Sequence, residues 1–149
     1  MTSRSSAAPQ VHVLDPGVAT RPQRLTPEKF ARRDPASLTE FGHLLETFAV
    51  GELMKDASWM AGITSLGHWR THDHHKVDRV VERDDGAVIG FEVKAATRVA
   101  GNDFRGLRKL RDTVGEAFVA GVVLYTGARS YNYEDRLHAL PIDRLWTAI

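Results

Sequence analysis

A glutamate and a lysine stand two residues apart in the middle of residues 87–98, a run whose other residues are mostly apolar and typical of a buried β-strand. Successive side chains of a strand point to opposite faces, so Glu92 and Lys94 share one face with Val88 and Gly90. A carboxylate and an ammonium on one face can neutralise each other, or they can bind a metal ion and a phosphate group. The first alternative is a surface ion pair worth well under about 1 kcal/mol. The other residues of the chain are needed to choose between the two alternatives.

The rest of the chain predicts the strands that would position this pair. Strands are expected where apolar residues alternate or run without interruption, at residues 65–72, 76–83, 87–95, 118–127 and 136–142. Short polar turns join the first three, which indicates an antiparallel meander. The run at 118–127 is typical of a strand buried on both faces, at the centre of a mixed sheet that the chain reaches by a helical crossover.

Two main helices are expected to flank this sheet. The longer one begins near Ser37, where Glu40 three residues on is typical of a capping box, and it runs to about Trp59. The second runs from about residue 102 to Gly115 and has a basic exposed face. Shorter elements are expected at residues 11–21 (extended), 26–34 (helix) and 143–149 (helix).

Length and composition bound the fold class. With 149 residues, 42% hydrophobic and 26% charged, we expect one domain of mixed α/β (α+β) class over residues 11–149, after a disordered tail at residues 1–10. A formal net charge of +1 does not indicate nucleic-acid binding by bulk electrostatics. The absence of cysteine excludes disulfides and thiolate metal sites. Neither a signal peptide nor a membrane-spanning run is visible, so we expect a cytoplasmic protein with no membrane partner.

Several of these features together resemble a known nuclease superfamily. Val77-Asp78, a turn at Gly86 and the Glu92-Val93-Lys94 triplet follow a helix that carries Gly-His-Leu-Leu-Glu at residues 42–46. This arrangement resembles the PD-(D/E)XK nuclease superfamily. The resemblance implies a restriction-endonuclease-like core, in which a helix, three antiparallel strands, a helix and a further strand follow one another.

A narrower resemblance extends from about residue 11 to the end of the chain. Six segments in order are similar to the C-terminal domain of prokaryotic AAA-type ATPases known as domain of unknown function family 4143. The six segments are VHVLDPGVA, FGHLLETFAVGEL, HWRTHDHHKVDRVVE, GFEVKAA, DFRGLRKL and GVVLYTG. No G-x-x-x-x-G-K-[ST] motif occurs, so we expect this domain without the ATPase module.

The nuclease resemblance implies a metal site and a catalytic lysine. It makes Asp78, Glu92 and the helical Glu46 ligands of Mg²⁺ or Mn²⁺, which prefer hard carboxylate oxygens, and it adds the backbone carbonyl of Val93. Lys94, with Asp78 and Glu92, would then act on a phosphodiester bond, as in a metal-dependent deoxyribonuclease. Glu52 lies on a different side of the helix and is the second choice. The alternative reading makes Asp78 a polar residue on a solvated strand face and Glu46 an ordinary helix carboxylate.

The residues flanking Asp78 depart from the family pattern. Many members have an acidic residue just before the Val-Asp pair, where this chain has Lys76, and Arg79 follows where apolar residues are common. Added positive charge weakens the binding of a cation but helps to hold a phosphate.

Basic and aromatic side chains outside this group have two interpretations each. Arg105, Arg108 and Lys109 either contact a DNA backbone or form the solvated side of an amphipathic helix. The tryptophans are expected in or near the core rather than stacked on bases; they are Trp59, Trp69 and Trp146.

Histidines gather in and near the turn at residues 72–75. His68, His72, His74 and His75 surround Asp73 in the sequence, and neutral imidazoles bind Zn²⁺ or Ni²⁺. A solvated hairpin tip is the favoured interpretation, because polar residues collect in tight turns and no supporting pattern of second ligands is visible.

Two functions from different classes remain open. The first is a metal-dependent nuclease, or a nuclease-fold DNA-binding domain, centred on Asp78, Glu92 and Lys94. The second is a non-catalytic accessory module that binds a separate AAA-type ATPase or forms a homo-oligomer. Convergence of the acidic residues in one cleft would favour the first.

Overall fold

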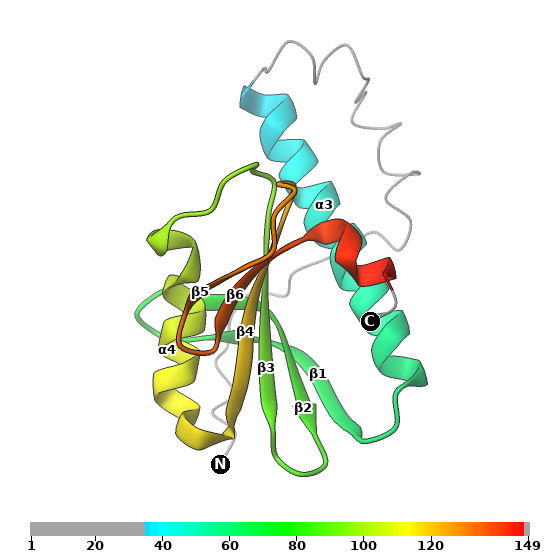
Figure 1. Cartoon of the computed structure of the whole chain (residues 1–149), viewed down its shortest axis with the longest axis vertical. Helices are drawn as coiled ribbons and strands as arrows, with labels where there is room; N and C mark the ends of the chain where they lie inside the picture. Colours follow the sequence, from blue (N-terminus) through cyan, green and yellow to red (C-terminus); the bar gives the residue numbers. More distant parts are fainter. Residues whose placement is uncertain (1–34, 148–149) are drawn as a thin grey trace.

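The computed structural model describes residues 35–147 (Figure 1). Its helices are α3 (Pro35–Trp59) and α4 (Arg105–Val114), with 3-10 segments η1 (Gly101–Phe104), η2 (Gly115–Ala117) and η3 (Ile142–Trp146). Its strands are β1 (Ile63–Arg70), β2 (Lys76–Arg83), β3 (Val88–Lys94), β4 (Phe118–Tyr125), β5 (Tyr131–Glu134) and β6 (Leu137–Pro141). The tail, extended segment and short helix expected within residues 1–34 lie outside the described residues.

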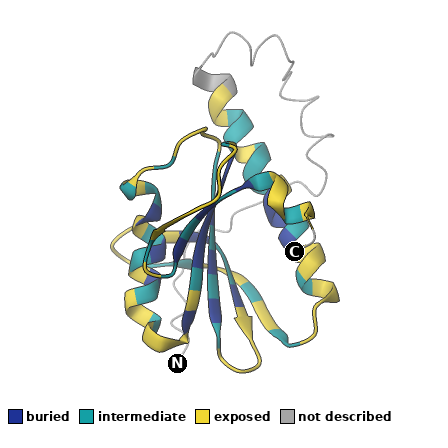
Figure 2. Ribbon diagram, viewed as in Figure 1, coloured by how far each residue is buried: buried dark blue, intermediate teal, exposed yellow. Residues whose placement is uncertain are grey.

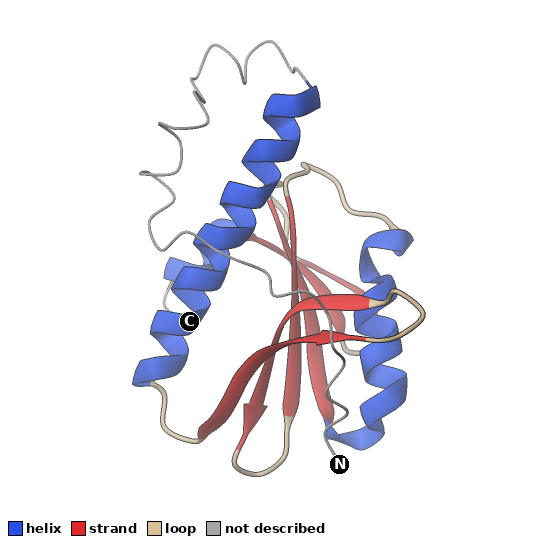
Figure 3. Ribbon diagram, turned by 180° about the vertical axis from the view of Figure 1, so that it is seen from behind, coloured by secondary structure: helices blue, strands red, loops and turns tan. Residues whose placement is uncertain are grey.

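The strands form one mixed, six-stranded sheet, drawn in red in Figure 3, and their order is β1-β2-β3-β4-β6-β5, as labelled in Figure 1. β1, β2 and β3 are antiparallel neighbours, so the predicted meander is confirmed. β4 lies parallel to β3, and α4 makes the crossover between them, as the apolar run at 118–127 predicts. The coarse expectation of a mixed α+β fold with a mixed sheet is therefore confirmed, while β5 is an edge strand that the sequence analysis does not anticipate.

The two helices cover opposite faces of the sheet, so both faces carry core residues (Figures 1 and 2). On one face, Leu107 and Leu110 of α4 pack with Val88 and Val123. This helix can lie close to β3 because position 90 is a glycine: a Cβ there would stand 2.7 Å from Leu107 Cδ2. The side of β3 that bears Glu92 therefore faces α4 rather than solvent.

On the other face, α3 packs through a small set of residues near its middle. Leu53 joins Val122 and Leu124 of β4 in a second apolar cluster, with Phe91 of β3 packed beside it. Phe91 and Glu92 are consecutive, so the strand presents an apolar side chain to α3 and an acidic one toward α4.

Two of the three tryptophans are not in the core, which corrects the expectation. Trp59 is 88% exposed because it ends α3, well past the buried Leu53, and Trp146 is 50% exposed on η3. Trp69 does pack against the core.

Within residues 35–147, no helix combines the length and the apolar character that crossing a membrane requires.

Candidate active site

Asp78 and Glu92 are the polar side chains that the described part of the chain buries, at 5% and 4% exposed. They lie on the neighbouring antiparallel strands β2 and β3, and their carboxyl groups are hydrogen-bonded to each other. The backbone N–H of Val93 also donates to Asp78 Oδ2, at 3.0 Å. We call these two residues the acid pair. Because Glu92 is buried, the alternative of an exposed Glu92–Lys94 surface pair is excluded.

The two carboxyls of the acid pair share one proton. Burial, the negative charge of Asp78 and the hydrogen bond between the carboxyls together raise the pKa of Glu92 to about 9, against the opposing charges of Lys94 and Lys76. Burial alone would also raise the pKa of Asp78, but the hydrogen bond from Glu92 and the charge of Lys76 outweigh burial and lower it. At neutral pH, protonated Glu92 therefore donates to ionised Asp78.

This proton makes the stability of the fold depend on pH. Unfolded Glu92 loses its proton above pH about 4.5, whereas folded Glu92 keeps it up to pH about 9. The native state therefore binds more protons in this window, and the free energy of unfolding falls by up to about 1.4 kcal/mol per pH unit. We expect Glu92→Gln, which keeps the donor and removes the titration, to match wild type near pH 4.5 and to be the more stable protein at pH 9.

Urea unfolding at several pH values, in the presence of a chelator, measures this difference. Glu82→Gln is the matched control because Glu82 is an exposed glutamate on β2, held only by a 3.4 Å contact from Ser65. Stability curves of wild type and Glu92→Gln that run parallel from pH 4.5 to 9 would show that Glu92 titrates normally in the fold.

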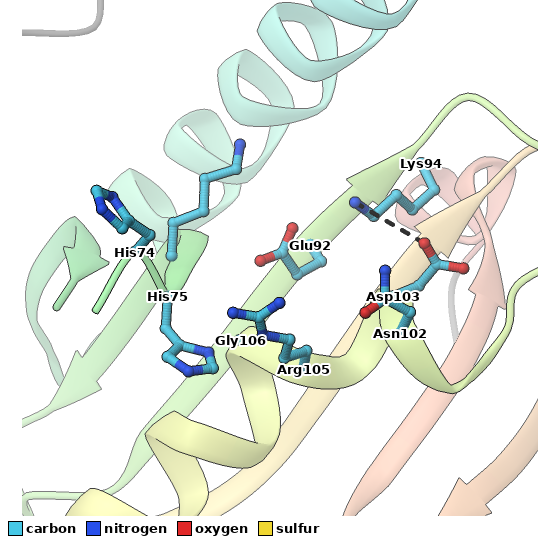
Figure 4. Close-up of a pocket in the computed structure, with 9 residues that line it drawn as sticks. His74, His75, Glu92, Lys94, Asn102, Asp103, Arg105 and Gly106 are labelled. Atoms are coloured by element: carbon cyan, nitrogen blue, oxygen red, sulfur yellow. Dashed lines mark ion pairs between the residues drawn. The ribbon is translucent and has the colours of Figure 1, made fainter. Parts of the chain in front are cut away.

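A pocket of about 290 Å³ opens over Glu92 on the α4 face of the sheet (Figure 4). Its lining comes from the turn before β2, from β3, from η1 and from the first turn of α4. The lining residues are His74, His75, Lys76, Glu92, Lys94, Asn102, Asp103, Arg105 and Gly106. With Glu92 protonated, three lysine and arginine side chains stand against the single carboxylate of Asp103, so the pocket attracts an anion.

Lys94 lies at the end of this pocket that η1 covers. Its Nζ is 3.9 Å from Asp103 Oδ1, a loose ion pair that is drawn as a dashed line in Figure 4. Asp103 itself is held in place because its Oδ2 accepts a hydrogen bond from the backbone N–H of Ala100, at 2.8 Å. Lys94 therefore keeps the freedom to turn its ammonium group toward a bound anion.

Lys76 lies on the acid pair itself. Its Nζ donates to Asp78 Oδ1 at 3.0 Å, and its side chain remains 49% exposed. Burial alone would lower the pKa of Lys76, but the charge of Asp78 and the hydrogen bond to it outweigh burial and raise the pKa. Lys76 is therefore a cation held against the buried, ionised carboxylate of Asp78.

Glu46 does not join the acid pair. Its charge acts on Lys76, at the rim of the site, and on Arg79, which shares a sheet face with Phe91. Among the described residues, no three His, Asp or Glu side chains converge on a position that could hold a metal ion. The physical reason is that α3 packs on the opposite face of the sheet from the acid pair.

Glu52, the second choice among the helix acids, links α3 to η3. It accepts hydrogen bonds from Lys55 Nζ at 2.6 Å and from Trp146 Nε1 at 2.9 Å. These partners hold its carboxylate away from the acid pair.

The three basic residues of α4 have different surroundings. Arg105 lines the pocket. The guanidinium of Arg108 is engaged within the protein, because it donates hydrogen bonds to both carboxylate oxygens of Glu134 and to the carbonyl of Gly101. Lys109 is half-exposed and lies 3.7 Å from Asp73. Arg105 and Lys109 are therefore better placed than Arg108 to reach a nucleic-acid backbone.

The histidine turn contributes two residues to the pocket wall. His74 and His75 both line it, and His75 Nε2 lies 3.6 Å from Asp73 Oδ2. His75 Nδ1 is buried without a hydrogen-bond partner. The turn is thus part of the pocket as well as the tip of a hairpin.

Sequence reasoning missed the contribution of η1 and of Gly106 to this pocket. Asn102 and Asp103 lie at the predicted start of the second helix, and the sequence analysis assigns them no role in a site. Gly106 could have been noticed because it stands in the first turn of an amphipathic helix, where glycine lowers helix stability. A glycine there indicates that another part of the backbone approaches the helix closely.

The comparison with family models identifies the family. The Domain of unknown function (DUF4143) model matches residues 41–145, about two thirds of the chain. The chain belongs to the DUF4143 family. This match spans both members of the acid pair, Lys94 and all the residues that line the pocket. No curated protein and no solved structure matches the chain.

The donor set of this DUF4143 domain fits a small divalent cation. Mg²⁺ is usually bound by one or two carboxylates, with water and phosphate oxygens filling its remaining positions. Asp78 and Glu92 are two adjacent carboxyls that already share a proton, and a cation would replace that proton. They are the residues that would hold Mg²⁺ or Mn²⁺.

Proposed function

We propose that this DUF4143 domain is a metal-dependent nuclease of the PD-(D/E)XK type that acts on phosphodiester bonds of DNA. The observation that carries the proposal is the buried acid pair beneath an open, cationic pocket that contains Lys94. The element order α3, β1 to β3, α4, β4 supports a restriction-endonuclease-like core.

The pocket suits a phosphate group that belongs to a larger molecule. At about 290 Å³ it lies just below the roughly 300–1,000 Å³ that is usual for sites that enclose a whole small molecule. Because the pocket is open, the DNA strand on either side of the phosphate can remain outside it. Arg105 would hold the phosphate oxygens, since a guanidinium group pairs with phosphate, and the ammonium of Lys94 would lie beside the same phosphate.

The acid pair and Lys94 divide the chemistry between them. Asp78 and Glu92 would hold Mg²⁺ or Mn²⁺, which supplies a Lewis acid and lowers the pKa of a bound water when it is present. Lys94 would stabilise the negative charge that develops on the phosphate oxygens during the reaction. Burial of the acid pair keeps both carboxyls fixed, so they need no reorganisation when a cation binds.

Cleavage of DNA in the presence of Mn²⁺ tests the proposal. We expect wild type to cleave with Mn²⁺ and not with a chelator, and we expect Asp78→Asn to lose this activity by about a hundredfold or more, as one essential electrostatic group is removed. Asp112→Asn is the control, because Asp112 is exposed near the other end of α4. Equal cleavage by wild type and Asp78→Asn would assign the activity to a contaminant.

A non-catalytic accessory module is the second candidate, and an exposed apolar surface favours it. Leu38, Phe48 and Trp59 of α3 are each more than a third exposed. Together with Trp146 of η3, whose ring packs at a tilt against Phe48 with 5.3 Å between ring centroids, they offer a docking face for a separate AAA-type ATPase. A wild type that cleaves no DNA but binds a purified AAA-type ATPase, with Trp59→Ser weakening that binding, would favour this candidate.

A further inference from the structure

We propose that Lys76 is a built-in competitor of the divalent cation: its ammonium occupies the cation position at Asp78 and moves to the phosphate when DNA enters the pocket. The inference rests on the proposed function and concerns how that same site is regulated. Its basis is the 3.0 Å hydrogen bond from Lys76 Nζ to Asp78 Oδ1.

The ammonium of Lys76 lies against the Asp78 oxygen that a metal ion would bind. Asp78 is 5% exposed, and its second oxygen is already taken by the backbone N–H of Val93. The oxygen that Lys76 contacts is therefore the one through which Asp78 would reach a metal ion. Two cations cannot share that oxygen without strong repulsion in a partly buried site.

The ammonium group of Lys76 is able to leave Asp78 and move into the pocket. Its side chain is half-exposed, and it lines the same pocket as Lys94 and Arg105. A lysine has a flexible four-carbon stem and a compact charge, so its ammonium can exchange one anionic partner for another without movement of the backbone. A phosphate in the pocket offers that second partner, and it leaves Asp78 free for the cation.

Exchange of this kind couples the two ligands. Binding of phosphate would raise the affinity for the cation, and binding of the cation would raise the affinity for phosphate by the same factor. The domain would then hold its metal tightly only when a phosphodiester is present.

Titration of Mn²⁺ against purified protein, followed by the electron paramagnetic resonance of free Mn²⁺, tests this competition. We expect Lys76→Met, which keeps the stem and removes the charge, to bind Mn²⁺ at least tenfold more tightly than wild type. Lys55→Met is the matched control, since Lys55 forms a 2.6 Å ion pair with Glu52 far from the pocket. Circular dichroism of each variant establishes that it is folded.

The possible results separate the inference from the proposed function. Equal Mn²⁺ affinity of wild type and Lys76→Met would overturn the inference alone, because the acid pair would still bind metal. Absence of Mn²⁺ binding in both proteins would overturn the inference and the metal-dependent function together.

A second titration tests whether the ammonium of Lys76 binds phosphate in the pocket. Inorganic phosphate, followed by ³¹P nuclear magnetic resonance without metal, is expected to bind Lys76→Met several-fold more weakly than wild type. An unchanged affinity for phosphate would overturn the exchange.

Discussion

Replacing Lys94 with alanine is expected to lower the rate of DNA cleavage by about a hundredfold or more, while the affinity for DNA stays close to that of wild type. Lys94 borders the pocket, and its ion pair with Asp103 is a loose one at 3.9 Å, so its charge is available to the phosphate. Negative charge on the phosphate grows toward the transition state, so the ammonium stabilises that state more than the bound DNA. Single-turnover cleavage of single-stranded and branched DNA with Mn²⁺ gives the rate, and fluorescence anisotropy with Ca²⁺ gives the affinity.

Lys55→Ala is the control for the removal of a surface lysine, because Lys55 lies on α3 and pairs with Glu52. A parallel loss of cleavage and of affinity in Lys94→Ala would show that Lys94 only binds DNA. Cleavage that survives the substitution would remove Lys94 from the reaction.

Replacing Gly106 with alanine is expected to lower the free energy of unfolding by about 3 kcal/mol and to abolish phosphate binding in the pocket. A Cβ at position 106 would collide with the backbone carbonyl oxygen of Lys76 and would stand 3.1 Å from Glu92 Oε1. Neither neighbour can turn away, because one is backbone and the other is buried in the acid pair. The first turn of α4 would have to move off β2, and the wall of the pocket would move with it.

Thermal and urea unfolding measure the loss of stability, and titration with inorganic phosphate measures the pocket. Gly51→Ala is the matched control, since Gly51 is also helical but a Cβ there would meet nothing within 4 Å. That control should be as stable as wild type or more so by up to about 1 kcal/mol, because alanine favours a helix over glycine. Similar stabilities of the two variants would show that α4 does not depend on close contact with β2.

The elements with a strong apolar pattern could be predicted from the sequence. The second helix is one such element: Leu107 and Leu110, three residues apart, have the spacing of one helix face, and both are fully buried. The continuous apolar run of β4 predicted a central strand, and β4 pairs with β3 on one side and β6 on the other. In each case the local pattern and the tertiary packing require the same structure.

The edge strand β5 could not be predicted, because its residues carry no such pattern. Tyr131 to Tyr133 are exposed, and the strand is only four residues long. Pairing with β6 and stacking of Tyr133 on Phe104, at 4.2 Å between ring centroids, hold it in place. The pairing with β6 is a local hairpin, but the contact of Tyr133 with Phe104 joins residues far apart in the sequence, so no short window of sequence reveals everything that holds the strand in place.

The candidate site was predictable in part for a similar reason. The period of a strand placed Glu92 and Lys94 on one face, but it could not tell that α4 would cover that face and bury Glu92. The contact between Lys76 and Asp78 depends on side-chain conformation at the start of β2, and the distance of Glu46 from the acid pair depends on how α3 crosses the sheet. Such features are set by packing between elements rather than by spacing along the chain.

The position of a bound Mn²⁺ ion tests the central claim most directly. Crystals grown at pH 8 with saturating Mn²⁺ and a short DNA strand would give an anomalous difference map that locates the metal without any assay of activity. We predict a peak within roughly 2.0–2.3 Å of carboxylate oxygens of both Asp78 and Glu92, with Lys76 Nζ displaced from Asp78. A peak at the histidine turn of residues 72–75, or no peak beside Asp78, would contradict the assignment of the acid pair as the metal site of a nuclease.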